Sequence, residues 1–366
     1  MINSIKTTIK STIWRYYAFT FFWSLHFFSA VLVPFFTQWG GITKTQMFLL
    51  QSWFLIWIFL LEVPTGAVAD YLGRKVSLTL GALCLVLATL VYGSIPRFEI
   101  FLLGEFLFAL SFALVSGAND ALLYDALKEA GREDESKKIF GRAHSLTLLG
   151  FLISAPIGSF IASSFDVNFP MLFTAIPMFI AAILALSIKE PKVHEGPSES
   201  KRYIDIVNKG FKFFYQHKTL RLIALDAIIV SAAAYYVIWL YQPLLLKLGI
   251  PIFYFGSFHV IMIASEIAVV LNFIGLEKIF GSARNYLSFS ALITSIAFIM
   301  VSFFQGMTTI VFVSMFRRFT IALLNPIVGI LSDKSLGFAL LFAGLLPLLV
   351  FFFSPVEKSM LEEKSE

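Results

Sequence analysis

Eleven stretches of about 20 mostly apolar residues follow one another along this chain, and they constrain its fold more than any other feature. Each stretch is long enough to cross a bilayer, and a crossing segment must be helical because lipid offers no partner to unpaired backbone groups. The hydrophobic fraction of 58%, the charged fraction of 14% and the mean hydropathy of +0.84 exclude a soluble domain. We therefore predict an all-α polytopic membrane protein with about 11 transmembrane helices. The predicted spans lie near 14–36, 47–69, 76–94, 99–127, 139–163, 169–188, 222–246, 253–274, 286–305, 308–331 and 336–353.

The basic residues predict the orientation of these spans. Most of the 28 Lys and Arg fall in gaps that face the cytoplasm if the N-terminus lies inside. The formal charge of +5 then serves orientation, and we expect the lipid bilayer, not nucleic acid, as a partner. The single cysteine, Cys84, lies within an apolar run and predicts neither a disulfide nor a cysteine metal site. We expect a multi-pass protein of the cytoplasmic membrane; its oligomeric state does not follow from the sequence.

A long polar interruption divides the chain into two parts. It covers residues 190–221 and ends in an amphipathic segment typical of a helix lying on the cytoplasmic membrane surface. We predict an N-terminal half of six spans at 1–189, this linker at 190–221, and a C-terminal half of five spans at 222–366.

A short hairpin between the second and third predicted spans carries a recognisable set of residues. Gly66 and Asp70 come at the end of one span, Gly73 suits a tight turn at positive φ, and Arg74 and Lys75 follow on the cytoplasmic side. An ordinary positive-inside loop would account for the two bases but not for the placed glycines and acid. The pattern resembles the loop signature of the major facilitator superfamily.

The resemblance implies a two-halved helical bundle around a central cavity that opens alternately to each side. It also implies that the hairpin residues hold the two halves together in the outward-open state. In that family an acid at the inner end of the fourth span joins the loop charges. Asp120 and Asp125 both lie there, Asp125 being the better match, and Arg142 lies within reach at the start of the fifth span. We expect these three residues to form a gating charge network.

Ionisable residues inside predicted spans are candidates for proton coupling, because lipid makes them costly to keep. Glu62 either carries a proton or serves as a structural partner of a base such as Arg142. Glu105 stands approximately where related proton-coupled transporters carry an arginine, and we hypothesise that it carries a proton or binds a cationic substrate. The candidates are Glu62, Glu105, Asp226 and Glu266.

Further residues are candidates for the cavity wall, since the resemblance places the first and seventh spans there. A histidine inside a span is also commonly hydrogen-bonded to a neighbouring helix, and aromatic residues commonly serve packing. The cavity candidates are His26, Asn119, Tyr235, Trp239 and Gln242.

The fifth predicted span contains small residues around Pro156, from Gly150 to Gly158. This segment resembles, imperfectly, a bend that marks antiporters of the superfamily. Together with the many aromatic residues, it favours proton-coupled efflux of a small amphipathic or cationic molecule, in the manner of drug exporters. The alternatives are a proton-coupled uptake permease for a metabolite and a non-transporting, shortened membrane protein.

The tenth predicted span departs from the superfamily pattern. Arg317 and Arg318 lie near its middle, at a cost of roughly 3 kcal/mol each in a bilayer centre. The segment resembles an eleventh span of related transporters, so we expect a second half shortened around span ten. The alternative is a genuine eleven-span protein whose arginine pair faces a polar cavity.

No nucleotide-binding loop, zinc-ligand spacing or nucleophile motif occurs in the sequence. We therefore expect neither an enzyme nor a cofactor.

Overall fold

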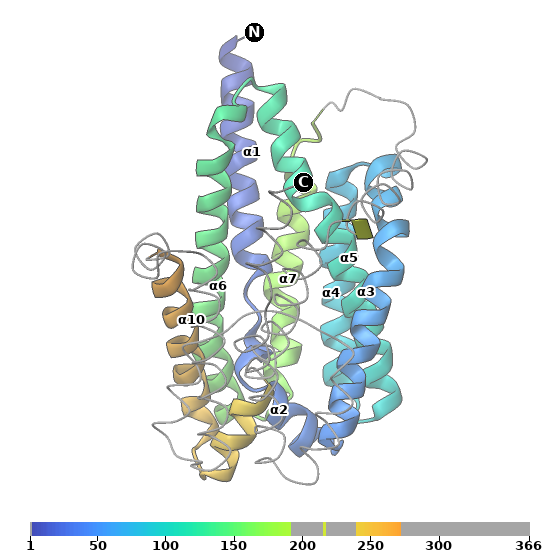
Figure 1. The fold of residues 1–366 in the computed structure, drawn as a ribbon, viewed down its shortest axis with the longest axis vertical. Helices are drawn as coiled ribbons and strands as arrows, with labels where there is room; N and C mark the ends of the chain where they lie inside the picture. The colour runs from blue at the N-terminus through green and yellow to red at the C-terminus, as the bar shows by residue number, and fades with distance from the viewer. Residues whose placement is uncertain (1, 192–214, 217–238, 272–366) are drawn as a thin grey trace. The chain divides into compact units, whose positions relative to one another are not determined.

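The computed structural model describes residues 2–191, 215–216 and 239–271, and the chain forms two compact units. The first unit comprises residues 1–194 together with 249–263, and the second comprises the remainder. Nearly all described residues belong to the first unit, which is wholly helical (Figure 1). The predicted spans at 286–305, 308–331 and 336–353, the arginine pair and nearly all of the 190–221 linker lie outside the described residues.

Five long helices confirm the predicted second to sixth spans. They are α3 (Lys44–Leu72), α4 (Arg74–Ser94), α5 (Phe98–Glu129), α6 (Ser136–Ser164) and α7 (Phe169–Ser187). Within the described ranges these are the helices long and apolar enough to cross a membrane, and a bent sixth segment joins them if counted as one span. The all-helical, multi-pass character expected from the sequence is therefore confirmed, while the total of eleven spans stays a prediction.

The bent segment covers the helical span predicted at 14–36 and shows that it is broken. Helix α1 (Ile2–Trp23) ends early, and a 3-10 turn (Phe27–Ala30), the short α2 (Leu32–Pro34) and a π-helical turn (Phe35–Trp39) follow. The two parts of the segment, Ser11–Ala30 and Leu32–Trp39, meet at 60°.

Two residues explain this break. The Ser24 hydroxyl donates to the Thr20 carbonyl over 2.7 Å, and the Ser24 amide donates to the Phe21 carbonyl, which tightens the end of α1. Pro34 cannot donate, and its ring would clash with the Ala30 carbonyl in a continuous helix. In the first turn of α2, by contrast, its missing N–H costs nothing.

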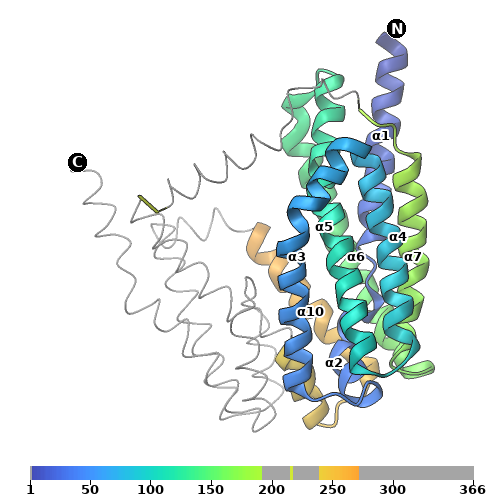
Figure 2. The same ribbon diagram turned by 90° about the vertical axis from the view of Figure 1, so that its right-hand side faces the viewer.

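The helices of the first unit pack as two neighbouring groups joined through α4. In Figures 1 and 2, α3, α4 and α5 lie side by side, α4 also contacts α7, and α1 lies against α6 and α7. Two serines lock α4 to α5: Ser77 donates to the Leu114 carbonyl and Ser111 donates to the Gly81 carbonyl, each over 2.7 Å. Such bonds replace the hydrophobic driving force that helices lack inside lipid.

A 3-10 turn (Ile252–Tyr254) and helix α10 (Phe255–Leu271) occupy the predicted eighth span. At the start of α10, a Cβ added to Gly256 would lie 2.5 Å from the Ala155 carbonyl oxygen and 2.6 Å from the Pro156 Cα. The first turn of α10 therefore packs backbone to backbone on α6.

Candidate functional site

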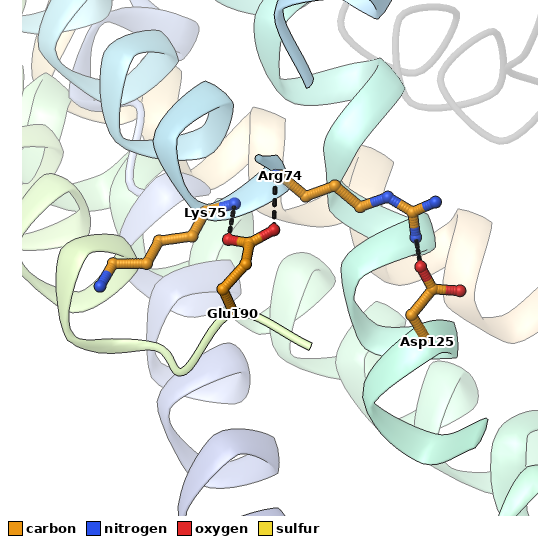
Figure 3. Close-up of polar contacts among 4 residues, drawn as sticks. All are labelled: Arg74, Lys75, Asp125 and Glu190. Carbon is orange, nitrogen blue, oxygen red and sulfur yellow. Dashed lines mark hydrogen bonds and ion pairs between the residues drawn. The ribbon is translucent and has the colours of Figure 1, made fainter. Parts of the chain in front are cut away.

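The α3–α4 hairpin is built around Gly73 and one carboxylate. Gly73 has φ +98°, as its place in the sequence predicts, and α4 begins at the next residue. The free amides of Arg74 and Lys75 donate to the two oxygens of Glu190, over 2.7 and 2.8 Å (Figure 3). A Cβ on Gly73 would lie 3.1 Å from the Glu190 carboxyl carbon. Glu190, just beyond α7, thus caps α4 with a full negative charge, the sign that a helix N-terminus favours.

The side chain of Arg74 makes a second interhelical contact from the same turn. Its Nη1 makes an ion pair with Asp125 Oδ2 near the C-terminal end of α5, and both side chains are about one-fifth exposed (Figure 3). A single residue therefore links α4 to the segment after α7 through its backbone and to α5 through its side chain.

The other members of the predicted charge network do not join this pair. Asp120 accepts from the Asn119 amide over 3.1 Å and from the buried Tyr16 hydroxyl over 3.4 Å, so it faces α1. Arg142 is exposed and lies beside Tyr17, in a cleft between α1 and α6. The predicted set thus divides into three separate places.

The remaining hairpin candidates are placed as follows. Asp70 is exposed at the end of α3. A Cβ added to Gly66 would meet nothing within 4 Å, although α5 contacts the Gly66 backbone. The contact comes from the opposite side, where a Cβ on Gly117 of α5 would lie 3.9 Å from the Gly66 Cα.

Glu105 lies inside the bundle in a polar cluster of three helices. It is 6% exposed, and its Oε1 accepts a 2.9 Å hydrogen bond from the Gln51 amide of α3. The buried Tyr92 hydroxyl of α4 lies beside it. Within the described ranges Glu105 has no basic partner. Its neighbours are neutral, in contrast to those of Asp125.

His26 lies at the break of the first span and is 8% exposed. One ring nitrogen is hydrogen-bonded to the Trp23 backbone, and Nε2 has no partner among the described residues. The aromatic rings around the imidazole have centroids 5.3 to 6.5 Å away. They belong to Trp23, Phe28, Phe112 and Phe151.

Packed aromatic rings connect His26 with Glu105. Phe28 stacks on His26, Phe108 meets Phe28 edge-on at 5.7 Å, and Tyr92 meets Phe108 edge-on at 5.6 Å. Glu105, Phe108 and Phe112 are spaced to lie along one face of α5. The histidine and the acid are therefore ends of one contiguous packed cluster.

The small residues of α6 receive the broken first span. A Cβ on Gly150 would lie 2.7 Å from Ser24 Cβ, and one on Gly158 would collide with the Phe27 carbonyl. In this structure the segment that resembles an antiporter bend is the surface on which the break packs.

The remaining candidates are Glu62 of α3 and five residues of the second unit. Glu62 is exposed on α3, and the described residues contain no ion pair between it and Arg142. In the second unit residues 239–247 are helical, and this helix includes Trp239 and Gln242. The Gln242 amide donates to the Tyr241 hydroxyl over 3.1 Å. Asp226, Tyr235 and the side chain of Glu266 lie outside the described residues.

Sequence reasoning missed Glu190 and Gln51. Glu190 directly precedes Pro191 at the end of the sixth span, and a carboxylate beside a helix-stopping proline was the available signal. Gln51 is a polar residue inside an otherwise apolar span. Neither residue type indicates which residue it will bond to, because the hydrogen-bond partners of Glu190 and Gln51 are more than 50 positions away in the sequence.

The helical bundle, the capped hairpin and the buried polar clusters define a polytopic α-helical protein of the transporter class. The sequence profile of the Major Facilitator Superfamily matches residues 17–340, so the chain belongs to that superfamily. The matched residues make up most of the chain, and the superfamily is one of membrane transporters, not of enzymes.

One curated protein is similar to the chain in sequence, at low identity. An uncharacterized MFS-type transporter, YxaM of Bacillus subtilis (strain 168), is 27% identical over 192 residues, which are 51% of this chain and 47% of that protein. The match thus spans about half the length of this relative.

Solved structures share the fold at low identity. A point mutant of the nucleoside transporter NupG has a TM-score of 0.66 at 13% identity, covering 98% of this chain and 95% of that one. A D-xylose-proton symporter has a TM-score of 0.58 at 12% identity, with 95% and 89% covered. A bacterial homolog of the human lysosomal transporter Spinster, inward-facing, has a TM-score of 0.61 at 16% identity, with 98% and 85% covered.

Proposed function

We propose that the chain is a secondary transporter that moves a small amphipathic or cationic molecule across the cytoplasmic membrane by proton-coupled alternating access, as an efflux antiporter. The observation that carries the proposal is Glu105, a buried acid held by a neutral amide with no base beside it among the described residues. Burying a carboxylate charge without a cation costs several kcal/mol, and binding a proton removes that cost. Protonation therefore changes the relative stability of two arrangements that expose Glu105 differently.

The substrate class rests on the cluster at His26. Four aromatic rings surround the imidazole, and its Nε2, which has no partner among the described residues, can accept a hydrogen bond. Aromatic rings of this kind suit a flat, largely apolar molecule with one hydrogen-bond donor, whereas a sugar needs several convergent polar groups. The aromatic rings between His26 and Glu105 give a packed route by which substrate and proton binding influence each other.

The hairpin supplies the gate in this proposal. Glu190 and Asp125 hold the start of α4 from two sides, and opening the inner end requires these contacts to break or move as a unit. Asp70 and Lys75, the other gating residues predicted from the sequence, belong to the same hairpin and are part of the proposed gate.

The test is transport by the full chain in proteoliposomes with an imposed pH gradient, using a planar lipophilic cationic dye. We expect dye movement coupled to opposite proton movement, and Glu105→Gln should abolish the dependence on the pH gradient. Glu99→Gln is the matched control, because Glu99 is an exposed acid in the first turn of the same helix. Gradient-driven transport that persists in Glu105→Gln contradicts the proposed role of Glu105.

Proton-coupled uptake is the second candidate, because one solved relative in fold is a D-xylose-proton symporter. The same vesicles distinguish uptake from efflux. A symporter moves the substrate in the same direction as the protons, and an antiporter moves it in the opposite direction.

A further inference from the structure

A cleft of about 200 Å³ opens between α1 and α6, away from the hairpin and the His26 cluster. Its polar and aromatic lining comes from three elements. Trp14 and Tyr17 belong to α1, Arg132 and Glu135 to the α5–α6 connection, and Lys138 and Arg142 to α6. None of the contacts described above explains this concentration of positive charge.

The bases of the cleft outnumber its acid. Arg132 donates two hydrogen bonds of 2.7 Å to the oxygens of Glu135, so this pair is internally compensated. Lys138 and Arg142 have no acidic partner within 4 Å in the described part of the chain. The described lining of the cleft thus carries two more positive charges than negative ones, which leaves it suited to an anion.

The surroundings of the cleft are those of a membrane interface. Trp14 is 72% exposed, and an exposed tryptophan beside a tyrosine is typical of the boundary between lipid and water. The cleft lies at the end of the bundle that carries the N-terminus and the α5–α6 connection (Figure 1). Two turns further along α6, the 44% exposed Leu149 lies on the same face as Arg142.

We propose that this cleft binds the phosphate group of an anionic phospholipid of the inner leaflet, through Lys138 and Arg142. The proposal uses the predicted orientation, with the N-terminus inside, and goes beyond the proposed transport function. The cytoplasmic leaflet carries anionic lipids, and basic pockets between membrane helices on that side bind their head groups. Trp14 then lies at the level of the lipid glycerol, and the exposed apolar face of α6 accommodates an acyl chain.

A lipid is favoured over free phosphate because the charged residues occur together with exposed apolar surface. Inorganic phosphate uses only the two bases, whereas a phospholipid also covers Trp14 and Leu149. Inorganic phosphate and the phospholipid head group share the same phosphate chemistry. A competition experiment between them shows which one the cleft prefers.

The experiment is native mass spectrometry of the detergent-purified full chain titrated with phosphatidylglycerol, with phosphatidylcholine as the neutral reference. We expect retention of phosphatidylglycerol and roughly 30-fold weaker binding in the double variant Lys138→Gln/Arg142→Gln, since each base near an anionic surface contributes a factor of about five. The matched control is Lys137→Gln, which removes an exposed charge from the same turn of α6 outside the cleft lining and should bind within about twofold of the parent. The charge-conserving Lys138→Arg/Arg142→Lys should retain binding, which guards against misfolding of the neutral variant.

A roughly fivefold weakening by Lys137→Gln, which is the share of one charge in the double variant, overturns the proposal, because the lipid would then follow net charge alone. Displacement of the lipid by millimolar inorganic phosphate, with phosphate bound as tightly as lipid, also overturns it in favour of a simple anion site. Since the measurement requires neither transport nor a known orientation, its failure is distinguishable from failure of the proposed function.

Discussion

The hairpin end of the bundle and its interior hold their acids in opposite ways. Asp125 faces a guanidinium and Glu190 faces the positive end of a helix, whereas Glu105 faces an amide. His26 and Glu105 are enclosed by aromatic rings and closely packed backbone. The hairpin therefore depends on charge, and the interior depends on shape and neutral hydrogen bonds. Charged contacts near water are exchangeable for hydration, which suits a gate, while a neutral buried setting makes the gain or loss of one proton costly.

The largest effect should come from breaking the shape of the interior. Gly158→Val places a side chain against the Phe27 carbonyl, and a backbone atom cannot swing aside, so we expect a loss of at least about 3 kcal/mol in stability. Thermal unfolding can be followed in detergent through dye labelling of the single thiol, Cys84.

Gly141 supplies the control for this substitution. A Cβ there meets nothing within 4 Å on the same helix, so Gly141→Ala should be neutral or stabilising by about 0.5–1 kcal/mol. Comparable destabilisation by both variants would show that α6 tolerates no added side chain at either position. It would contradict the view that Gly158 is needed because α6 packs on the broken first span.

Removal of a charge partner at the hairpin should have the next largest effect. Arg74→Ala leaves the partly buried Asp125 without its cation and should cost about 1–3 kcal/mol in detergent unfolding. Asp125→Asn in the same background should recover part of the loss, because the uncompensated charge disappears. A double variant no more stable than Arg74→Ala would mean that the ion pair is not the source of the loss.

Glu105 differs from the hairpin acids, because its charge should be dispensable for the stability of the folded chain. Glu105→Gln preserves a hydrogen-bond acceptor for Gln51 and should unfold within about 1 kcal/mol of the parent. Glu105→Ala removes this acceptor and the packed side chain, and should cost about 2 kcal/mol. If the glutamine variant were as unstable as the alanine variant, a charged Glu105 would be part of the native interior.

The helix cap formed by Glu190 should contribute about 1 kcal/mol. Glu190→Gln retains an oxygen acceptor but removes the charge at the start of α4, so unfolding should shift by about that amount. Lys189→Gln, at the exposed neighbouring position, should have little effect. An equal shift in both would place the contribution in the chain segment and not in the cap.

The smallest effect concerns the exposed pair at the α5–α6 connection. The hydrogen bonds from Arg132, and secondarily its charge, lower the pKa of Glu135 below its usual range. Because the pKa in the folded state is below that of the unfolded chain, the stabilising contribution is present above the unfolded value of about 4.3 and is lost as the pH falls through the folded-state pKa. The difference in unfolding temperature between the parent and Glu135→Gln should therefore be small near pH 7 and should close on acidification. A difference that grows on acidification would have the wrong sign.

Several parts of the fold were predictable because they depend on local chemistry. Helices α3 to α7 follow from apolar length, since lipid forces each such run to satisfy its own backbone. The turn at Gly73 follows from the absence of a Cβ. Pro34 and Ser24 were visible signals of a break in the first span, but the continuous apolar run outweighed them.

Membership of the superfamily, the helical class and the membrane setting were determined by the sequence alone, because hydrophobic length, glycine geometry and charge placement act over a few neighbouring residues. The partners of those residues were decided only by the tertiary structure. Arg74 pairs with Asp125 but not with Asp120, Glu190 caps a helix more than 100 positions earlier in the chain, and Gln51 meets Glu105 across two helices. Hydrogen bonds and ion pairs act over about 3–4 Å, and the rotation of one helix against another selects which side chains come that close.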